Sequence, residues 1–318
     1  MKNLTPMMKQ YMEIKSRYKD SILFFRLGDF YEMFFEDAIT ASRELEITLT
    51  QRDCGMEEKA PMCGVPHHVA DTYVARLVAK GYKVAICEQV EDASEAKGLV
   101  RRDVIRVVTP GTITDDNVLE EKSNNFLTSI YFDDLGVGIS YVDNSTGEMY
   151  TTEYSGYTVE DNYRFVLDEL GKISPAEIIC NEKFMSDSNY INIINNKINP
   201  FFNIYKDSAQ ARTKLGGKIT NLFDGKNFKD LNIEGKIYSI LATDKLIEYL
   251  YETQKNSLDH INQLIYYKPY EYMVLDINTR TNLELHETIM SKQKKGALIH
   301  VIDKTSTAMG GRLLKKWL

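Results

Sequence analysis

The sequence has little of what a membrane protein or an exported protein needs. Its longest apolar runs, residues 21–25 and 104–108, fall far short of the roughly 18–20 residues that cross a bilayer. The first residues, MKNLTPMMKQYMEIK, lack the apolar centre of a signal peptide. We therefore expect a cytoplasmic protein with no membrane partner.

Cysteine is scarce, with four residues at uneven spacing in a chain of 318. A disulfide framework is typical of shorter, cysteine-rich secreted chains, so we expect reduced thiols at Cys54, Cys63, Cys87 and Cys180. His67 and His68 follow two of these cysteines, but the spacing C-x8-C-x3-H-H lacks the close pairs of a zinc site. We expect one of the two histidines to cap the backbone of a loop instead.

An excess of basic charge is also missing. The formal net charge is −7, which on its face argues against a nucleic-acid partner, because binding to phosphates depends on gathered Lys and Arg side chains. Residues 97–106 are a local exception, with a single acid, Asp103, among four basic residues. The candidate phosphate contacts are Lys97, Arg101, Arg102 and Arg106. The alternative is an ordinary solvated charged face.

No G-x-x-x-x-G-K-[ST] pattern occurs in the sequence. The chain therefore cannot form the phosphate-binding loop of a P-loop ATPase, and the stretch MGGRLLKK is only superficially similar to it. We expect no catalytic residue and no cofactor in this chain.

The patterns that are present alternate between helix and strand and predict an α/β (α+β) fold in several parts. Residues 1–115 predict a small mixed-sheet α/β domain, and the polar residues 116–125 a linker. Residues 126–235 carry a β-β-β-α-β order that resembles ribonuclease H, although no element is predicted for 191–235. Residues 236–318 predict a helical region that stops inside an amphipathic pattern, as a truncated chain would.

Several local elements follow from apolar periodicity and from turn residues. Thr5 and Pro6 predict a helix start, with the threonine as cap and the proline at the first helical position. Residues 21–28 predict a buried strand that ends at glycine, followed by a helix from Phe30 to Leu45. Further expected elements are a strand at 47–52, a helix at 237–262, a strand at 272–278 and a helix at 279–294.

The motif GDFYE, residues 28–32, stands where the first buried strand ends. One interpretation is that Phe30, Phe34 and Phe35 all pack inward and Glu32 is a first-turn acid favoured by the helix dipole. The other is that Phe30 projects as an aromatic wedge beside a hydrogen-bonding acid, the pair needed to stack on an exposed base and contact its edge.

Four blocks of sequence resemble the mismatch-recognition domain of the MutS family, in the same order and at comparable spacing. They are FRLGDFYEMFFEDA (25–38), APMCGVPHH (60–68), VAICEQVEDA (84–93) and VVTPGT (107–112). The segments LDINTRTNLEL (275–285) and TAMGGRLLKKWL (307–318) are similar to the start of the family's lever domain. The resemblance implies a mismatch-recognition domain at 1–115, a connector at 126–235 and the truncated start of the core domain at 236–318.

The resemblance also implies roles for individual residues. Phe30 would stack on a mispaired or unpaired base from the minor groove, and Glu32 would hydrogen-bond to that base. Inserting a ring costs unstacking energy of a few kcal/mol, least where pairing is already poor, so discrimination would come largely from the deformability of the DNA. Arg52 matches a basic position that faces DNA, and Met62 a loop near the backbone. The alternative for these two is a salt bridge and core packing.

Partners and cofactors are likewise implied by the resemblance. We expect binding to double-stranded DNA with mismatches or small insertion/deletion loops, a homodimer of the full-length parent, and the repair protein MutL as a downstream partner. ATP and Mg²⁺ would bind in the C-terminal region absent from this chain, where the parent is an ATPase. The location would be the bacterial cytosol, at the nucleoid.

Two functions of other classes compete with mismatch binding. Asp143 lies on a strand of the ribonuclease-H-like part, where nucleases place a metal-binding acid, and Glu148, Asp168 and Glu169 are further candidates for a two-metal site. The connector could also be a pure protein-interaction module. Cleavage that depends on Mg²⁺ or Mn²⁺ and is abolished by Asp143→Asn would favour the nuclease.

Overall fold

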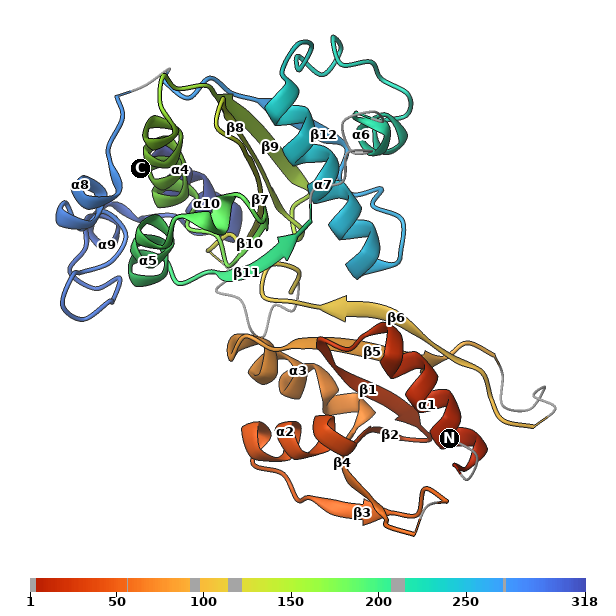
Figure 1. Ribbon diagram of the computed structural model, residues 1–318. Coiled ribbons are helices and arrows are strands. Elements are labelled where there is room, and N and C mark those ends of the chain that lie inside the picture. The colour runs from red at the N-terminus through yellow and green to blue at the C-terminus, as the bar shows by residue number, and fades with distance from the viewer. Residues whose placement is uncertain (1–3, 56, 92–97, 114–121, 207–214, 271–272) are drawn as a thin grey trace. The chain divides into compact units, whose positions relative to one another are not determined.

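The computed structural model describes residues 4–55, 57–91, 98–113, 122–206, 215–270 and 273–318. Two six-stranded sheets, both mixed, and several helices make up these residues, which confirms the predicted α/β fold class. The chain divides into two compact units (Figure 1). Unit 1 comprises Met1–Val118 with Leu250–Ser257, and unit 2 comprises Leu119–Tyr249 with Leu258–Leu318.

Unit 1 is built on a sheet with the strand order β3-β4-β2-β1-β5-β6. Strands β1 and β5 are parallel, and the other neighbours are antiparallel. Its elements are α1 (Pro6–Arg17), β1 (Ser21–Leu27), β2 (Phe30–Phe34), α2 (Phe35–Leu45), β3 (Thr50–Arg52), β4 (Ala60–Pro66), η1 (His67–Val69), α3 (Ala70–Ala79), β5 (Lys83–Gln89) and β6 (Arg102–Val108).

The predicted start of the first helix is confirmed. The Thr5 hydroxyl accepts a hydrogen bond from the Met8 backbone N–H at 3.4 Å, and Pro6 is the first helical residue. Met8, Tyr11 and Ile14 of α1 are buried against the sheet together with Leu23 and other strand residues. One core of unit 1 therefore lies between α1 and the sheet, and α2 and α3 bury further apolar residues of their own.

The predicted helix from Phe30 to Leu45 is wrong in its first part. Residues 30–34 form strand β2, because they pair with β4 on one side and with β1 on the other. Gly28, with a φ of 59° that glycine adopts without strain, makes the turn that sets Phe30 opposite Leu27. The helix α2 then runs only from Phe35 to Leu45. The strand predicted at 47–52 is shorter as well and forms at Thr50–Arg52.

Unit 2 contains a sheet with the strand order β11-β10-β7-β8-β9-β12. Strands β7, β8 and β9 form an antiparallel meander, and β10 and β11 follow in parallel on the other side of β7, the arrangement expected for a ribonuclease-H-like unit. Its strands are β7 (Phe126–Phe132), β8 (Val137–Asp143), β9 (Glu148–Tyr154), β10 (Glu177–Asn181), β11 (Phe201–Tyr205) and β12 (Gln263–Tyr266). Its helices are α4 (Val159–Ile173), η2 (Phe184–Ser186), α5 (Ser188–Lys197), α6 (Gly217–Leu222), α7 (Ile237–Gln254), α8 (Ile277–Asn282), α9 (Leu298–Ile302) and α10 (Ala308–Trp317). The end of α7, from Leu250, is counted with unit 1.

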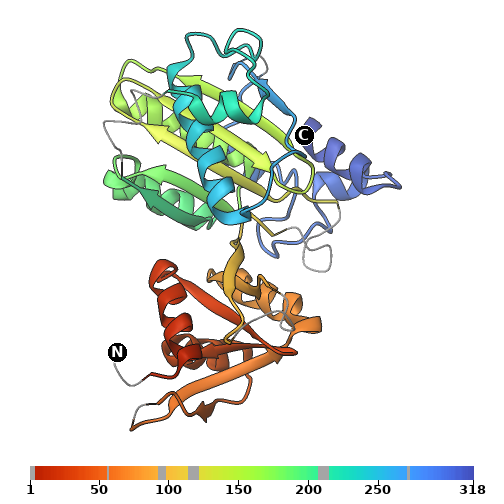
Figure 2. The same ribbon diagram turned by 90° about the vertical axis from the view of Figure 1, so that its right-hand side faces the viewer.

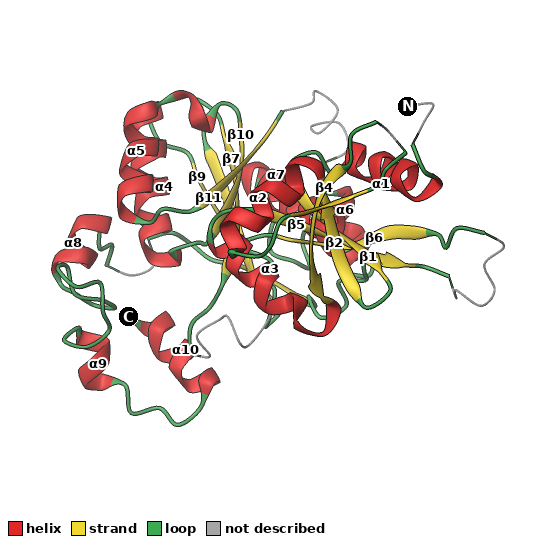
Figure 3. Ribbon diagram, turned by 90° about the horizontal axis from the view of Figure 1, so that it is seen from below, coloured by secondary structure: helices red, strands yellow, loops and turns green. Residues whose placement is uncertain are grey.

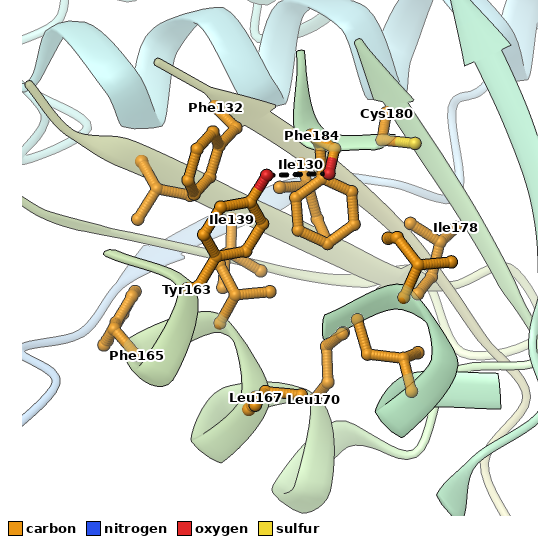
Figure 4. Close-up of a cluster of buried hydrophobic side chains, with 14 of the residues drawn as sticks. Ile130, Phe132, Ile139, Tyr163, Phe165, Leu167, Leu170, Ile178, Cys180 and Phe184 are labelled. Atoms are coloured by element: carbon orange, nitrogen blue, oxygen red, sulfur yellow. Dashed lines mark hydrogen bonds between the residues drawn. The ribbon is translucent and has the colours of Figure 1, made fainter. Parts of the chain in front are cut away.

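Helices cover the second sheet on both faces. Ile130 and Phe132 of β7 pack against α4 and α5, where the Tyr163 hydroxyl donates a hydrogen bond to the Phe184 carbonyl oxygen at 3.0 Å (Figures 3 and 4). Tyr131 points to the other face and packs against Leu241 of α7. Successive residues of a strand point to opposite faces, so β7 contributes to two cores.

Helix α7 approaches the sheet closely (Figure 2). A Cβ atom at Gly138 would lie 1.9 Å from the Tyr238 carbonyl oxygen, and the Thr243 hydroxyl lies 3.2 Å from the Ser140 hydroxyl. Strand β12 extends the same sheet by pairing with β9 in parallel. Residues 236–318 were expected to begin a separate helical region. Their first helix, α7, instead packs on the second sheet, and their strand β12 is part of that sheet.

The strand predicted at 272–278 is wrong in the part that the structure describes. Residues 273–276 form no strand, and α8 begins at Ile277, because the Asp276 carboxylate accepts from the Thr279 N–H at 2.7 Å and caps the helix. The helix predicted at 279–294 ends at Asn282. Across the described residues, no helix is long and apolar enough to cross a membrane.

Candidate nucleic-acid interface

Phe30 opens strand β2 and is 46% exposed, whereas Tyr31, Met33 and Phe34 of the same strand are buried. Its backbone is held on both sides, opposite Leu27 of β1 and Pro66 of β4. A ring that lies partly free on a rigid strand is available for stacking. The structure therefore does not pack all the aromatic residues of the motif inward.

The turn before Phe30 is anchored by the residue that follows β4. The His67 backbone N–H donates to the Asp29 carbonyl oxygen at 2.9 Å, and the Nδ1 atom of the His67 ring lies 3.1 Å from the same oxygen. This is the backbone capping expected for one of the two histidines. It ties the turn of residues 28–29 to the end of β4.

Glu32 shares the sheet face of Phe30, because alternate residues of a strand point to the same side. Gly64 of β4 lies directly opposite Glu32. A Cβ atom there would lie 3.4 Å from the Glu32 Cγ atom and 3.2 Å from the Tyr31 carbonyl oxygen, so glycine leaves the space that the glutamate side chain occupies. The Glu32 carboxylate forms an ion pair with the guanidinium of Arg52 on β3.

Arg52 and Met62 lie in the same part of the sheet as Glu32. The Arg52 side chain is 40% exposed and that of Glu32 is 16% exposed. Met62 is a strand residue, opposite Phe34 and Thr50, and packs partly buried against the core, rather than standing in the loop expected for it. The strand order β3-β4-β2 brings together residues that are far apart in the sequence.

The basic stretch does not form one continuous face in the described residues. Arg102 is 7% exposed, and its guanidinium donates to the Arg26 carbonyl oxygen at 2.7 Å and lies 5.1 Å from the centre of the Phe25 ring. Burial lowers the pKa of Arg102. Arg102 therefore has a structural role in place of the expected phosphate contact, because its guanidinium holds β6 to β1.

The other three basic candidates differ from one another. Arg101 is exposed, and its backbone N–H donates to the Glu91 carboxylate at 2.6 Å. Arg106 is half-buried, with a guanidinium N–H on the Thr112 carbonyl oxygen at 3.2 Å. Lys97 lies outside the described residues. As phosphate contacts, these three stay predictions.

A polar cluster on the opposite face of β1 and β2 was not predicted. The Tyr31 hydroxyl donates to the Glu88 carboxylate, and Arg26 lies 3.6 Å from the same carboxylate and donates to the Gly28 carbonyl oxygen at 2.6 Å. Burial, followed by the neighbouring carboxylate, raises the pKa of Tyr31. The alternation in the segment YKVAICEQ places Glu88 on a strand, but only the parallel β1–β5 pairing brings it to Tyr31.

Two of the residues nominated for a nuclease, Asp143 and Glu169, serve local structure. The buried Asp143 carboxylate accepts from the Ser145 hydroxyl at 2.6 Å, from the Ser145 N–H at 2.9 Å and from Asn124 at 2.7 Å. Glu169 accepts from the Tyr267 hydroxyl at 2.7 Å and pairs with Lys172. Within the part of the chain that the structure describes, no three His, Cys, Asp or Glu side chains are grouped to hold a metal.

Family comparisons divide the chain into three matched segments. Residues 5–117 match MutS domain I, residues 125–262 match MutS domain II, and residues 278–318 match MutS domain III. The first match contains the whole described sheet of unit 1, and the second contains α7.

Individual relatives match the chain from end to end. A protein of Alkaliphilus oremlandii is 54% identical over 320 residues, one of Acetivibrio thermocellus is 51% identical over 320, and one of Clostridioides difficile is 52% identical over 319. All three are named DNA mismatch repair protein MutS. The matches cover 100% of this chain but 36%, 36% and 32% of the relatives, so the chain spans about a third of their length.

Proposed function

Because the chain belongs to the MutS family, we propose that it takes part in DNA mismatch repair by binding mispaired or unpaired bases in duplex DNA. Unit 1 makes the contact with the lesion. Phe30 enters from the minor groove and stacks on the base, and Glu32 hydrogen-bonds to that base.

The exposure of Phe30 on a strand whose other large side chains are buried carries this proposal. Wedging an aromatic ring into duplex DNA costs a few kcal/mol of unstacking, and the kink that follows is cheapest at a poorly paired step. The strands on both sides of β2 hold the backbone of Phe30, so the ring needs little further ordering before it stacks.

Glu32 supplies the second part of the selectivity. A carboxylate in the negative minor groove is repelled by phosphates, which disfavours every complex in which it gains no hydrogen bond. A displaced base at a mismatch offers donors that a paired base keeps in its own pair. The acid therefore penalises matched DNA more than mismatched DNA.

Titration of a G·T duplex and a single-base-bulge duplex against a matched duplex, at two salt concentrations, tests the proposal. Wild type, Phe30→Ala and Tyr157→Ala are compared, the last removing a fully exposed aromatic ring of unit 2 as a control. Each variant is measured in two proteins. One is this chain, and the other is a full-length MutS in which this chain is followed by the remaining C-terminal sequence of the Alkaliphilus oremlandii relative. Phe30→Ala should lose the mismatch preference and Tyr157→Ala should keep it. A preference retained by full-length Phe30→Ala refutes the proposed role.

The partners and cofactors follow the same proposal. Duplex DNA with mismatches or small insertion/deletion loops is the ligand, in a full-length homodimer in which one subunit presents Phe30 to the lesion. ATP and Mg²⁺ bind outside these 318 residues, which themselves catalyse no reaction, and MutL is the downstream partner. The protein acts in the bacterial cytosol at the nucleoid.

A further inference from the structure

Glu32 and Arg52 form an ion pair that crosses the middle strand of three. Glu32 lies on β2 opposite Gly64 of β4, and Arg52 lies on β3 opposite Ala60 of the same strand. All four residues therefore lie on one sheet face, because directly opposed residues of antiparallel strands share a side. Within the described residues, the Glu32 carboxylate has no other hydrogen-bond partner.

The two ends of this pair differ in their access to solvent. The glutamate side chain is 16% exposed and lies over Gly64, whereas the arginine side chain is 40% exposed on a strand of three residues. An ion pair with one exposed partner is weak and easily exchanged. The guanidinium can accordingly leave while the carboxylate stays beside Phe30.

We propose that Arg52 exchanges partners on mismatch binding and thereby contributes to specificity. In free protein and on matched DNA it stays on Glu32; at a mismatch Glu32 turns to the displaced base and Arg52 turns to a backbone phosphate. This inference rests on the proposed function of Glu32. Arg52 acts as a positioning residue for the carboxylate and as a conditional phosphate contact.

The exchange suits the chemistry of both ligands. A guanidinium presents its N–H groups in a planar fork that fits a carboxylate and a phosphate equally well, so little is lost in changing from one to the other. On matched DNA, Glu32 finds no new donor and keeps the cation. The number of phosphates neutralised therefore differs by one between the two complexes.

The salt dependence of binding measures that difference directly. Each neutralised phosphate adds about 0.9 to the magnitude of the slope of log K against log salt concentration. In the full-length protein described above, wild type should show a slope steeper by about 0.9 on G·T DNA than on matched DNA. Arg52→Gln should lower the slope on G·T DNA by about 0.9, weaken that complex roughly tenfold, and leave the matched slope unchanged.

A second test measures the salt slopes of the Glu32→Gln variant on both duplexes. Without the carboxylate, Arg52 is free on both duplexes, so the matched slope should steepen by about 0.9 and equal the mismatched one. Adding Arg52→Gln should then lower both slopes. Because Glu32→Gln keeps Arg52 in place, this second test examines the exchange even where Arg52→Gln fails to fold.

Arg43→Gln is the matched control, since it also removes one ion-paired guanidinium from unit 1. The Arg43 side chain is 69% exposed, pairs with Glu44 at 3.2 Å, and lies on α2. That helix contacts Cys63, whose thiol is 3.4 Å from the Ala38 carbonyl oxygen, on the face of β4 opposite to Met62 and Gly64. Arg43→Gln should therefore leave the salt-dependence slopes on both duplexes unchanged.

An equal loss of slope on both duplexes with Arg52→Gln, or a loss on neither, overturns the exchange. The first result would make Arg52 an ordinary phosphate contact, and the second a permanent partner of Glu32. Phe30→Ala separates this failure from that of the proposed function. If Phe30→Ala abolishes the mismatch preference but wild type shows equal salt slopes on G·T and matched DNA, the proposed role of Phe30 is supported and the partner exchange of Arg52 is refuted.

Discussion

Glu32 is an acid in a place where the proposed ligand is a polyanion. Its position is set by three neighbours: Phe30 on the same face, Gly64 beneath its side chain and Arg52 as its counter-ion. The structure holds the carboxylate in place instead of leaving it to solvent. Under the proposed function, a carboxylate held in this way weakens binding to matched DNA and favours binding to mismatched DNA.

Replacing Glu32 with glutamine should raise affinity for matched DNA by roughly three- to tenfold, because a charge repelled at close range by phosphates is removed. Mismatched affinity should change less, since the lost hydrogen bond to the base offsets the lost repulsion. Binding constants for G·T and matched duplexes at equal salt give the ratio. An unchanged ratio contradicts the role of Glu32.

His286 predicts a pH dependence of stability in unit 2. Burial, followed by Arg280 and Lys315, lowers the pKa of His286 from 6.5 to about 4. The unfolded chain therefore binds a proton between these values while the native chain does not, so stability is lost as pH falls from about 6.5 to about 4. Partial exposure reduces the effect to about 1–2 kcal/mol.

Urea unfolding at pH 7 and pH 5 checks this dependence. His286→Gln should reduce the difference between the two pH values, and His300→Gln, which removes an exposed imidazole of α9, should not. The same pH difference in wild type and His286→Gln would exclude His286 as its source.

At the scale of elements, the close contact between β8 and α7 depends on one small residue. Gly138→Ala places a Cβ atom 1.9 Å from the Tyr238 carbonyl oxygen, a distance that helix and strand must separate to relieve. Overpacking of this kind should cost about 3 kcal/mol or more, because the obstacle is backbone and cannot rotate away. Chemical unfolding measures the loss.

Gly217→Ala, at the start of α6, is the control for the same chemical change. A Cβ atom there meets nothing within 4 Å, and a helix gains from alanine, so stability should stay equal or rise by up to about 1 kcal/mol. A similar loss in both variants would mean that the contact with α7 is not the cause.

Sequence patterns predicted elements well where one local signal decided them. Thr5 and Pro6 predicted the start of α1, and the apolar face from Ile237 predicted the start of α7, although that helix ends at Gln254 and not at the predicted Asn262. The patterns failed where distant pairing decides: Phe30–Phe34 carries apolar residues that suit helix or strand, and β4, from Ala60 onward, makes it a strand. Residues 272–278 carry a strand-like pattern, but the cap at Asp276 makes their end the start of a helix.

The candidate site shows the same division between local and distant information. The family resemblance pointed to Phe30, Glu32 and Arg52 as separate residues. The ion pair between Glu32 and Arg52 requires the strand order β3-β4-β2, which no local pattern contains. Arg102 was misjudged for a related reason, since its burial depends on packing against β1 and α1.

At the scale of the whole molecule, the acidic net charge leaves the phosphate contacts to the basic residues nominated from the sequence, and only part of that set lies exposed in the described residues. The net charge is −7, and the structure uses Arg102 internally. The Arg52 side chain is 40% exposed and Arg101 is an exposed residue. Arg106 is half-buried, and Lys97 lies outside the described residues. Under the proposed function, these nominated residues supply at most four phosphate contacts.

The salt dependence of the 318-residue chain should accordingly be shallow. Four phosphate contacts at most give a slope magnitude of about 3.6, so raising salt from about 50 to about 200 mM should weaken binding by no more than roughly 150-fold. Titrations of the G·T duplex across that range measure the slope. A magnitude above about 6 would require more phosphate contacts than these four residues supply, and the basic surface would then have to include side chains elsewhere on the chain.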